Sequence, residues 1–325
     1  MDVAKKILIL SILCMSMTYY LEIETPLTQS VLSWKKRGHY FKYKEHSIYF
    51  LKQTNDSPKT KSSLVLLHGF PSFSYDWAKL LKNLENYDKF EDIITFDFIG
   101  YGLSDKPRNH LYSIFEQANI TDALIKHLKL KNVHILAHDY GDTVAQELLA
   151  RWNKNEVTDW NLQSVCLSNG GIFPETNFPR PTQKLLRLPY LGSFLSKLMF
   201  YGAFRRGFSE VFGPKTQPTE EEFQDYWSAI RQQAGEAISY RLLHYISERQ
   251  ENKERWTNAL VSSKVPLHVI YGPADPVNPR GFIEFYKNTV PNSEVTVLRD
   301  HISHYPQVED VEAFSEAFKN FLNSQ

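Results

Sequence analysis

A short strand-like run that ends in a five-residue turn most constrains how this chain folds. Residues Val133–Leu136 are mostly apolar, residues 137–141 read Ala-His-Asp-Tyr-Gly, and a helix-like stretch follows at Thr143–Trp152. A strand that turns sharply into a helix holds one side chain out at the top of a sheet, and the flanking residues must be small. Ala and Gly at the two ends of this turn meet that need. The pattern therefore predicts a nucleophile elbow with Asp139 at its tip.

A carboxylate at this tip selects a particular chemistry. If it attacked an ester carbonyl, the product would be a reactive anhydride. If it displaces a leaving group from an sp³ carbon, the product is a stable alkyl-enzyme ester that water can cleave later. Asp139 therefore points to epoxides or alkyl halides as substrates. The alternative is that Asp139 only caps the helix that begins near Thr143, and the partners of Asp139 decide between the two.

Two residues farther along the chain have the types and the order that such a reaction needs. A histidine must activate water, a carboxylate must orient the histidine, and the order in this kind of site is nucleophile, acid, histidine. Asp275 and His304 each follow an expected strand, where doubly wound sheets gather their sites. His301 is the alternative base, but His304 begins the run that leads past Glu309 into the final helix. We predict a catalytic triad of Asp139, Asp275 and His304.

Two backbone N–H groups are the expected donors to the oxyanion that forms when water attacks the ester. One belongs to Phe70, which follows the strand ending at Leu67, and the other to Tyr140, directly after the nucleophile. Residues 68–71, His-Gly-Phe-Pro, can also be interpreted as a plain tight turn. The two interpretations are compatible, because Gly69 would let the backbone approach the site closely.

Strand and helix patterns alternate along most of the chain, which favours a mostly parallel sheet covered on both faces. An antiparallel hairpin is expected at 40–43 and 47–51. The other strands are expected at 63–67, 93–96, 133–136, 162–168, 267–271 and 294–298, and the helices at 75–84, 114–128, 143–152, 282–288 and 311–322.

The alternation stops between Ile172 and about Trp256, where helical patterns and prolines occur without a convincing strand. This break predicts a helical cap inserted into the sheet domain. The fold class is therefore α/β, a doubly wound sheet with an inserted cap. We place the sheet domain at 36–171 and 257–325, the cap at 172–256 and an N-terminal hydrophobic segment at 1–24.

Together these motifs resemble the epoxide hydrolase and haloalkane dehalogenase branch of the α/β-hydrolase superfamily. The resemblance rests on residues 68–71, on residues 97–107 (Asp-Phe-Ile-Gly-Tyr-Gly-Leu-Ser-Asp-Lys-Pro), on the Asp139 turn and on the segments around Asp275 and His304. It implies an α/β-hydrolase fold, an Asp nucleophile and a reaction without a cofactor. Epoxide opening through a covalent alkyl-enzyme ester is the leading activity.

Haloalkane dehalogenases differ from this chain at two positions. They typically have Trp after the nucleophile and a second halide donor, often Asn, in the first loop, where this chain has Tyr140 and Phe70. A phenyl ring cannot donate a hydrogen bond to a departing halide, so dehalogenation is disfavoured. Epoxide hydrolases use cap tyrosines as acids, and we take Tyr190 and Tyr245 as candidates. The cap also contains Tyr201, Tyr226 and Tyr240, and packing is the usual role of such residues.

The N-terminus resembles a signal anchor. Lys5 and Lys6 precede an apolar run at residues 7–21, whose 15 residues fall short of a full membrane span. A cleaved signal peptide or a buried helix are the alternatives. Residues 112–118, 138–142, 167–176 and 300–307 resemble a narrower group of anchored, hydrolase-like proteins of the endoplasmic reticulum. That resemblance implies localisation to this membrane, and passage through the secretory pathway after signal cleavage is the alternative.

The composition limits the classes of partner and cofactor that the chain is expected to bind. Lys plus Arg and Asp plus Glu both number 37, so no net charge recruits nucleic acid. No metal site is predicted, because the histidines and cysteines form no metal-ligand pattern on one expected element. No cofactor is predicted either, because Gly100 and Gly102 lack the third glycine of a phosphate-binding loop.

The apolar stretch Leu185–Phe204 has three open roles: it lines a tunnel, packs on the sheet domain, or lies against the same membrane as the N-terminal run. Packing is the commonest role of such a stretch. An anchored enzyme with an apolar cap would suit a lipophilic small-molecule substrate. The alternatives are hydrolysis of another lipid-like substrate, or a membrane-anchored pseudo-hydrolase that binds lipid or protein without turnover.

Overall fold

The computed structural model describes residues 5, 11, 25–291 and 294–325. The hydrophobic segment predicted at 1–24 lies outside the described residues, apart from Lys5 and Ser11. Within the described residues, no helix combines the length and the apolar character that crossing a membrane requires.

The core of the molecule is one eight-stranded sheet with the strand order β1-β2-β4-β3-β5-β6-β7-β8. Only the β1–β2 and β2–β4 pairs are antiparallel, which confirms the predicted mostly parallel, doubly wound sheet. The strands are β1 (His39–Tyr43), β2 (His46–Thr54), β3 (Ser62–Leu67), β4 (Asp92–Phe96), β5 (Asn132–Ala137), β6 (Asn161–Ser168), β7 (Leu267–Tyr271) and β8 (Glu294–Val297).

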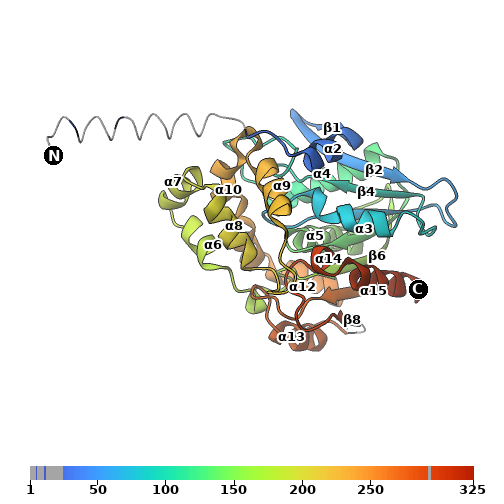
Figure 1. Ribbon diagram of the computed structural model, residues 1–325. Coiled ribbons are helices and arrows are strands. Elements are labelled where there is room, and N and C mark those ends of the chain that lie inside the picture. Colours follow the sequence, from blue (N-terminus) through green and yellow to red (C-terminus); the bar gives the residue numbers. More distant parts are fainter. Residues whose placement is uncertain (1–4, 6–10, 12–24, 292–293) are drawn as a thin grey trace.

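Alternate residues of the strands point into two hydrophobic cores, one on each face of the sheet. In β5, Val133, Ile135 and Ala137 belong to one core and Leu136 to the other. Helices from separate parts of the chain cover the two faces (Figure 1). The first core includes α4 (Ile114–His127), α5 (Tyr140–Asn153), α12 (Lys253–Val261) and α13 (Gly281–Thr289), and the second includes α2 (Gln29–Arg37), α3 (Ala78–Asn83) and α15 (Val311–Asn323).

Helix α5 lies in the middle of the molecule, and its first eleven residues are all buried. Its buried Glu147 accepts hydrogen bonds from Arg255 Nε at 2.7 Å and from Trp256 Nε1 at 2.9 Å. These bonds attach α12 to α5. The boundary predicted at residue 256 therefore falls inside a helix that packs on the sheet domain.

The chain between β6 and β7 forms the helical cap that the break in the pattern predicted. Its described residues contain helices and connecting loops but no strand. The cap comprises η2 (Pro174–Thr176), α6 (Pro181–Leu186), α7 (Leu191–Lys197), α8 (Tyr201–Ser209), α9 (Glu220–Ile230), η3 (Gln232–Ile238), α10 (Ser239–Leu242) and α11 (Tyr245–Glu251). In Figure 1 these helices lie together beside the sheet, at the edge where the parallel strands end.

Candidate active site

Asp139 occupies the sharp turn between β5 and α5. Its backbone has φ 47° and ψ −105°, a left-handed conformation that L-residues rarely adopt. Two glycines leave the space for this turn. A Cβ on Gly141 would lie 2.5 Å from the backbone oxygen of Leu67, and one on Gly69 would lie 2.7 Å from His138 Nδ1. Both positions therefore require glycine for the loop after β3 to approach the elbow.

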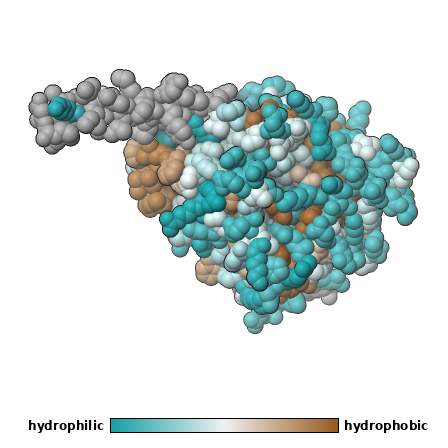
Figure 2. All heavy atoms as spheres, viewed as in Figure 1, coloured by the Kyte–Doolittle hydropathy of each residue, from teal (hydrophilic) through white to brown (hydrophobic). Residues whose placement is uncertain are grey.

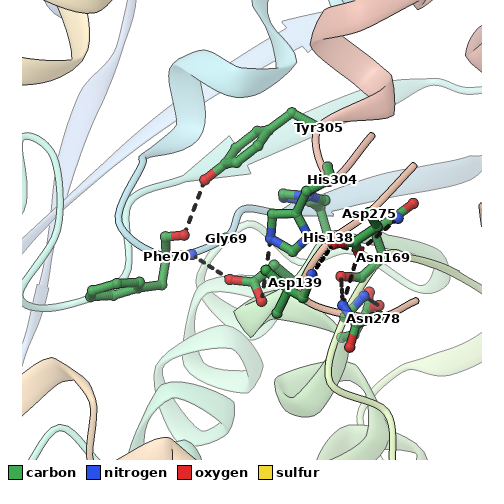
Figure 3. Close-up of polar contacts among 12 residues, drawn as sticks. Gly69, Phe70, His138, Asp139, Asn169, Asp275, Asn278, His304 and Tyr305 are labelled. Atoms are coloured by element: carbon green, nitrogen blue, oxygen red, sulfur yellow. Dashed lines mark hydrogen bonds and ion pairs between the residues drawn. The ribbon is translucent and has the colours of Figure 1, made fainter. Parts of the chain in front are cut away.

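The three predicted triad residues lie together at the carboxyl ends of β5, β7 and β8 (Figure 3). His304 Nδ1 lies 2.9 Å from Asp275 Oδ2, and His304 Nε2 lies 3.8 Å from Asp139 Oδ1. All three side chains are buried. His301, the alternative base, is partly exposed and does not line the pocket that contains Asp139 and His304.

His304 is held between carboxylates, and this controls its charge. Burial alone would lower the pKa of His304, but the carboxylates of Asp275, Asp139 and Glu309 outweigh burial and raise the pKa to about 9. At neutral pH the resting site therefore contains an imidazolium between Asp275 and Asp139. A serine nucleophile would need a neutral histidine to remove its proton at the start, whereas a carboxylate nucleophile needs none.

Two asparagines that sequence reasoning missed fix the Asp275 carboxylate. Asn169 Nδ2 donates to Asp275 Oδ2 at 2.9 Å, and Asn278 Nδ2 donates to the same oxygen at 3.0 Å. Burial alone would raise the pKa of Asp275, but His304 and these two amides outweigh burial and hold the pKa below its usual range. The available signal was position, because Asn169 directly follows β6 at the same edge of the sheet.

One of the two predicted oxyanion donors contacts the nucleophile directly. The backbone N–H of Phe70 donates to Asp139 Oδ2 at 2.9 Å. Tyr140 is the first residue of α5, so its N–H has no acceptor one turn earlier in the helix. The N-terminus of α5 also favours negative charge at Asp139. One carboxylate oxygen is thus held by a backbone donor, and Oδ1 is the oxygen nearer to His304.

The loop that presents the Phe70 N–H is fixed by buried polar contacts. His68 Nε2 accepts from the backbone N–H of Phe98 at 3.1 Å, so its Nδ1 donates to Gly69 O at 2.9 Å. Burial lowers the pKa of His68 to about 3, which keeps it neutral for this role. Tyr305 Oη donates to the backbone oxygen of Phe70 at 3.0 Å (Figure 3). The Phe70 peptide is therefore held from both sides.

Glu309 holds the loop that contains His304. Its carboxylate accepts from the backbone N–H groups of Ser303 and Tyr305, each at 3.0 Å. The same carboxylate accepts from the N–H of Gly213 in the cap at 2.9 Å, and from Thr216 Oγ1 at 2.5 Å. Glu309 therefore joins the cap to the two residues on either side of the candidate base.

Arg249 on α11 is a further site residue that no motif marks. Its guanidinium is buried, with Nη2 3.2 Å from the backbone oxygen of Asp139 and 3.9 Å from Asp139 Oδ1. Nε donates to Thr143 Oγ1 at 2.7 Å, and Cζ lies 4.5 Å from the ring centre of Tyr245. The cap thus supplies a buried cation to the nucleophile from 110 residues farther along the chain.

A pocket between the sheet domain and the cap ends at Asp139 and His304. Its volume is about 130 Å³. The cap side is mainly apolar and comes from α6, the loop before α8, α8, the turn after α8, α9 and α10. The apolar lining includes Leu186, Met199, Phe204, Phe208, Val211 and Ile230. The site therefore combines a buried carboxylate with an apolar binding cavity, an arrangement that suits a nonpolar substrate.

The two candidate cap acids have different fates. Tyr245 is buried, and its ring lies 6.1 Å from that of Phe70 and 5.1 Å from that of Tyr140. Burial and then the charge of Asp139 raise its pKa. Neither tyrosine is among the residues that line the pocket, and Tyr190 is 95% exposed at the start of α7. We therefore remove Tyr190 from the candidates, because its side chain points to solvent.

The other cap tyrosines also have partners away from Asp139. Tyr201 bonds to Glu220, Tyr226 packs on Phe208, and Tyr240 borders a separate surface groove. Tyr245 is thus the tyrosine of these five that packs against the residues around the nucleophile. Periodicity alone could not separate them, because the choice depends on how the cap folds back onto the sheet.

Comparison with known proteins agrees with this arrangement. A family model described as alpha/beta hydrolase fold matches residues 63–311. The human mesoderm-specific transcript homolog protein is 48% identical over 312 residues, which cover 94% of this chain and 92% of that protein. The narrower resemblance noted in the sequence was to this protein, and the comparison confirms it.

Two more distant proteins show the breadth of the likeness. Epoxide hydrolase 1 of Caenorhabditis elegans is 24% identical over 313 residues, covering 89% of this chain and 70% of that protein. Among solved structures, the haloalkane dehalogenase DatA of Agrobacterium tumefaciens C58 has a TM-score of 0.71 at 19% identity, covering 88% of this chain and 96% of that one. At that identity the structural likeness shows a common fold.

Proposed function

This chain belongs to the alpha/beta hydrolase fold family, and from that premise we propose that it hydrolyses lipophilic epoxides with Asp139 as the nucleophile. One observation carries the proposal. A buried carboxylate, in place of a hydroxyl, stands at the tip of the elbow beside a histidine whose pKa is raised to about 9. Such a pair begins catalysis with an ionised nucleophile and a protonated histidine, which suits attack on an sp³ carbon.

The first step forms the alkyl-enzyme ester. Because the Phe70 N–H holds Asp139 Oδ2, Oδ1 attacks a ring carbon of the epoxide. A new C–O bond forms, the ring C–O bond breaks, and its electron pair goes to the ring oxygen. Tyr245 donates a proton to that oxygen. The buried cation of Arg249 next to Asp139 and Tyr245 stabilises the tyrosinate that remains.

Ester formation itself prepares the base for the second step. It removes the negative charge of Asp139, one of the charges that raise the pKa of His304. The proton on His304 then passes through solvent to the Tyr245 tyrosinate. This transfer leaves His304 as a neutral imidazole. This imidazole takes a proton from water, and the hydroxide attacks the ester carbonyl carbon.

The oxyanion on Oδ2 is stabilised by the N–H groups of Phe70 and Tyr140. Its collapse breaks the bond between the carbonyl carbon and the ester oxygen, and that oxygen leaves as an alkoxide. The alkoxide takes the second proton of the attacking water from the Asp139 carboxyl group, which completes the diol. This transfer restores an ionised Asp139, with the first proton kept on His304. The net reaction is epoxide plus water giving diol, and the resting charges of the site return.

Halide displacement is less favoured by the same side chains. The Tyr140 ring packs among Phe98, Tyr101 and Tyr245 in the protein interior. Phe70 lines the pocket with a ring that has no polar hydrogen. The Phe70 ring offers no donor to a departing halide, and Tyr140 does not line the pocket, so an epoxide, whose oxygen stays bound to carbon, fits the site better.

We further propose that residues 7–21 anchor the enzyme in the endoplasmic reticulum membrane. The apolar run after Lys5 and Lys6 supports this, as does the resemblance of four segments to anchored proteins. An apolar pocket and a membrane location both suit a lipophilic substrate. Cell fractionation and N-terminal sequencing of the mature protein test the proposal. A soluble, shortened protein would favour signal cleavage instead.

The first experiment is turnover of a panel of lipophilic epoxides by the full chain. Asp139→Ala and the isosteric Asp139→Asn should form no diol, because neither supplies a carboxylate. His304→Ala should stop after one step and carry a covalent adduct on Asp139, visible by mass spectrometry. In a single turnover in ¹⁸O-labelled water, the oxygen added to the diol should come from Asp139, and the label should appear in the enzyme.

Other outcomes would contradict the proposal. Direct transfer of labelled oxygen from water to the product would exclude the ester. Unchanged diol formation by Asp139→Asn would show that Asp139 is not the nucleophile. If no epoxide reacts and no adduct forms, epoxide hydrolysis is the wrong function. Hydrolysis of another lipid-like substrate, or binding without turnover, then becomes the leading hypothesis.

A further inference from the structure

The cap carries an exposed apolar face on its outer side, which we call the outer cap face. Six of the eleven large hydrophobic residues that are exposed in the described chain lie between residues 185 and 200. Figure 2 shows hydrophobic residues gathered over the position that α7 has in Figure 1. Patches of this kind mark sites that contact a protein or a membrane. The six residues are Leu185, Leu188, Tyr190, Leu191, Phe194 and Phe200.

The same segment is strongly basic. Residues 180–206 contain six Lys or Arg and no Asp or Glu, so the rest of this neutral chain has a net charge of −6 (0 − 6). Arg180 and Arg205 form ion pairs with glutamates. Within the described residues, the other four basic side chains have no carboxylate within 4.0 Å. These four are Lys184, Arg187, Lys197 and Arg206.

We propose that the outer cap face rests on an anionic lipid bilayer. The evidence is the way charge and apolar surface alternate. Lys184 and Arg187 flank the exposed Leu185, and Arg187 also precedes the exposed Leu188. Lysine, represented here by Lys184 and Lys197, is depleted from protein–protein interfaces. At a membrane surface lysine and arginine are favourable, because their stems lie along the apolar layer while their charges reach anionic headgroups.

A surface groove beside this face has the chemistry of a headgroup site. It is lined by Arg187, Arg241 and His244 together with the exposed tips of Leu188 and Tyr190. Phosphate groups of anionic lipids would meet the guanidinium groups there, while the leucine and tyrosine enter the boundary with the acyl chains. The charges and the apolar tips thus support the same partner.

Two exposed residues that line the active-site pocket lie close in sequence to residues of the outer cap face. Thr182 is exposed, lines the pocket, and lies three residues before Leu185, so the two share one side of the helix. Ala203 is likewise exposed, lines the pocket, and lies three residues after Phe200. A nonpolar substrate could therefore pass from the bilayer to Asp139 with little exposure to water. Docking itself rests on the outer surface and holds whether or not the substrate is an epoxide.

The experiment measures depth in the membrane at single positions of the full chain. Cys14→Ser leaves the buried Cys166 as the native thiol. A fluorophore is then attached to Phe194→Cys on α7 or, as matched control, to Val297→Cys on β8, which is 46% exposed on the far side of the molecule. Vesicles of phosphatidylcholine, with or without phosphatidylserine, carry a nitroxide near the headgroups. We expect quenching at position 194 several-fold greater than at 297, stronger with phosphatidylserine and weaker in high salt.

A charge-reversal variant makes the test specific. Lys184→Glu, Arg187→Glu and Lys197→Glu together should abolish the phosphatidylserine-dependent part of the quenching, with an unchanged Tm as the check on folding. Vesicle-bound protein with equal quenching at 194 and 297 would overturn the proposal, because the N-terminal segment alone would then hold the chain. The proposal would also be overturned if quenching at position 194 were the same with and without phosphatidylserine and unchanged by charge reversal. An unquenched position 194 in a protein that dimerises would overturn it as well, and would assign the face to a second copy.

Discussion

At the scale of single residues, charge balance around Asp139 is the feature that links structure to reaction. Two buried cations, Arg249 and the protonated His304, face the carboxylates of Asp139 and Asp275. When Asp139 becomes an ester, its negative charge passes to the Tyr245 oxygen, which then takes the His304 proton and leaves a neutral imidazole. In the second step His304 gains a proton from water, and this positive charge stabilises the oxyanion. The same groups thus serve both steps because Asp139 and His304 change charge in between.

Arg249→Met should therefore impair the first step more than the second. Without the cation, ester formation should slow by about 10²-fold, and the uncompensated carboxylate should lower the free energy of unfolding by about 3–5 kcal/mol. Single-turnover measurement of adduct formation, with ester decay followed separately, checks this. Arg249→Lys keeps the charge and should recover part of the rate. Equal slowing of both steps in Arg249→Met would contradict the proposed role.

Glu309→Gln tests whether the hydrogen bonds that Glu309 accepts hold the loop around His304 in position. The amide cannot accept all four hydrogen bonds that Glu309 accepts now, so ester hydrolysis should slow by roughly tenfold or more. Ester formation should change little. Removal of the Glu309 charge also lowers the pKa of His304, so the pH profile of ester hydrolysis should move to lower pH. A purely structural role would slow the reaction without moving that profile.

The positions of Asp139, Asp275 and His304 were readable from the sequence because each follows a strand, and strand ends meet at one edge of a parallel sheet. The residues that support them were not. Asn169 contacts Asp275 across 106 residues, and Arg249 contacts Asp139 across 110. Such contacts depend on how loops and cap fold back on the sheet. A single Asn or Arg in a loop or cap helix has no local pattern that marks it.

At the scale of elements, α2 is a helix that lies outside every predicted helix range. Its nine residues contain only two buried side chains, Val31 and Trp34, so the apolar spacing is too sparse to stand out. The helix is stabilised by tertiary contacts instead. Trp34 Nε1 donates to Ser74 Oγ at 3.1 Å, and Thr28, which caps the helix, bonds to Asp225 of cap helix α9. Thus α2 bridges the sheet domain and the cap.

Trp34→Ala should expose how much α2 contributes. Removal of a buried indole leaves a cavity in the second core and should lower the free energy of unfolding by about 3–5 kcal/mol. Denaturant titration measures this loss. Ser33→Ala, on the exposed side of the same helix, is the matched control and should change stability by less than about 0.5 kcal/mol. A Trp34→Ala effect as small as that of the control would mean that α2 is dispensable.

At the scale of the whole molecule, the alternation of strands and helices predicted the sheet, and its interruption predicted the cap, because both are local periodic signals. Charge over the whole chain carries less information, since 37 basic and 37 acidic residues cancel. The positive charge of segment 180–206 is therefore a local feature and does not reflect a net charge of the whole chain. Stability against pH should likewise depend on individual buried groups.

His304 gives the clearest case of such a group. Its pKa in the folded chain is raised to about 9, against 6.5 when it is unperturbed. A raised histidine pKa means that folding binds the proton more tightly. The stabilisation is therefore complete below about pH 6.5 and is lost as the pH rises through about 9.

Other buried groups titrate in or near this window, so the prediction concerns a difference between two proteins. Burial raises the pKa of Asp76 to about 7 and lowers that of Lys106 to about 8. Both groups are unchanged in His304→Gln. The free energy of unfolding, measured by denaturant titration from pH 6 to 10, should favour the wild type most at the acidic end. The two curves should converge above about pH 9. Because Gln cannot bind the proton, a constant difference across the range would mean that His304 is not held as an imidazolium.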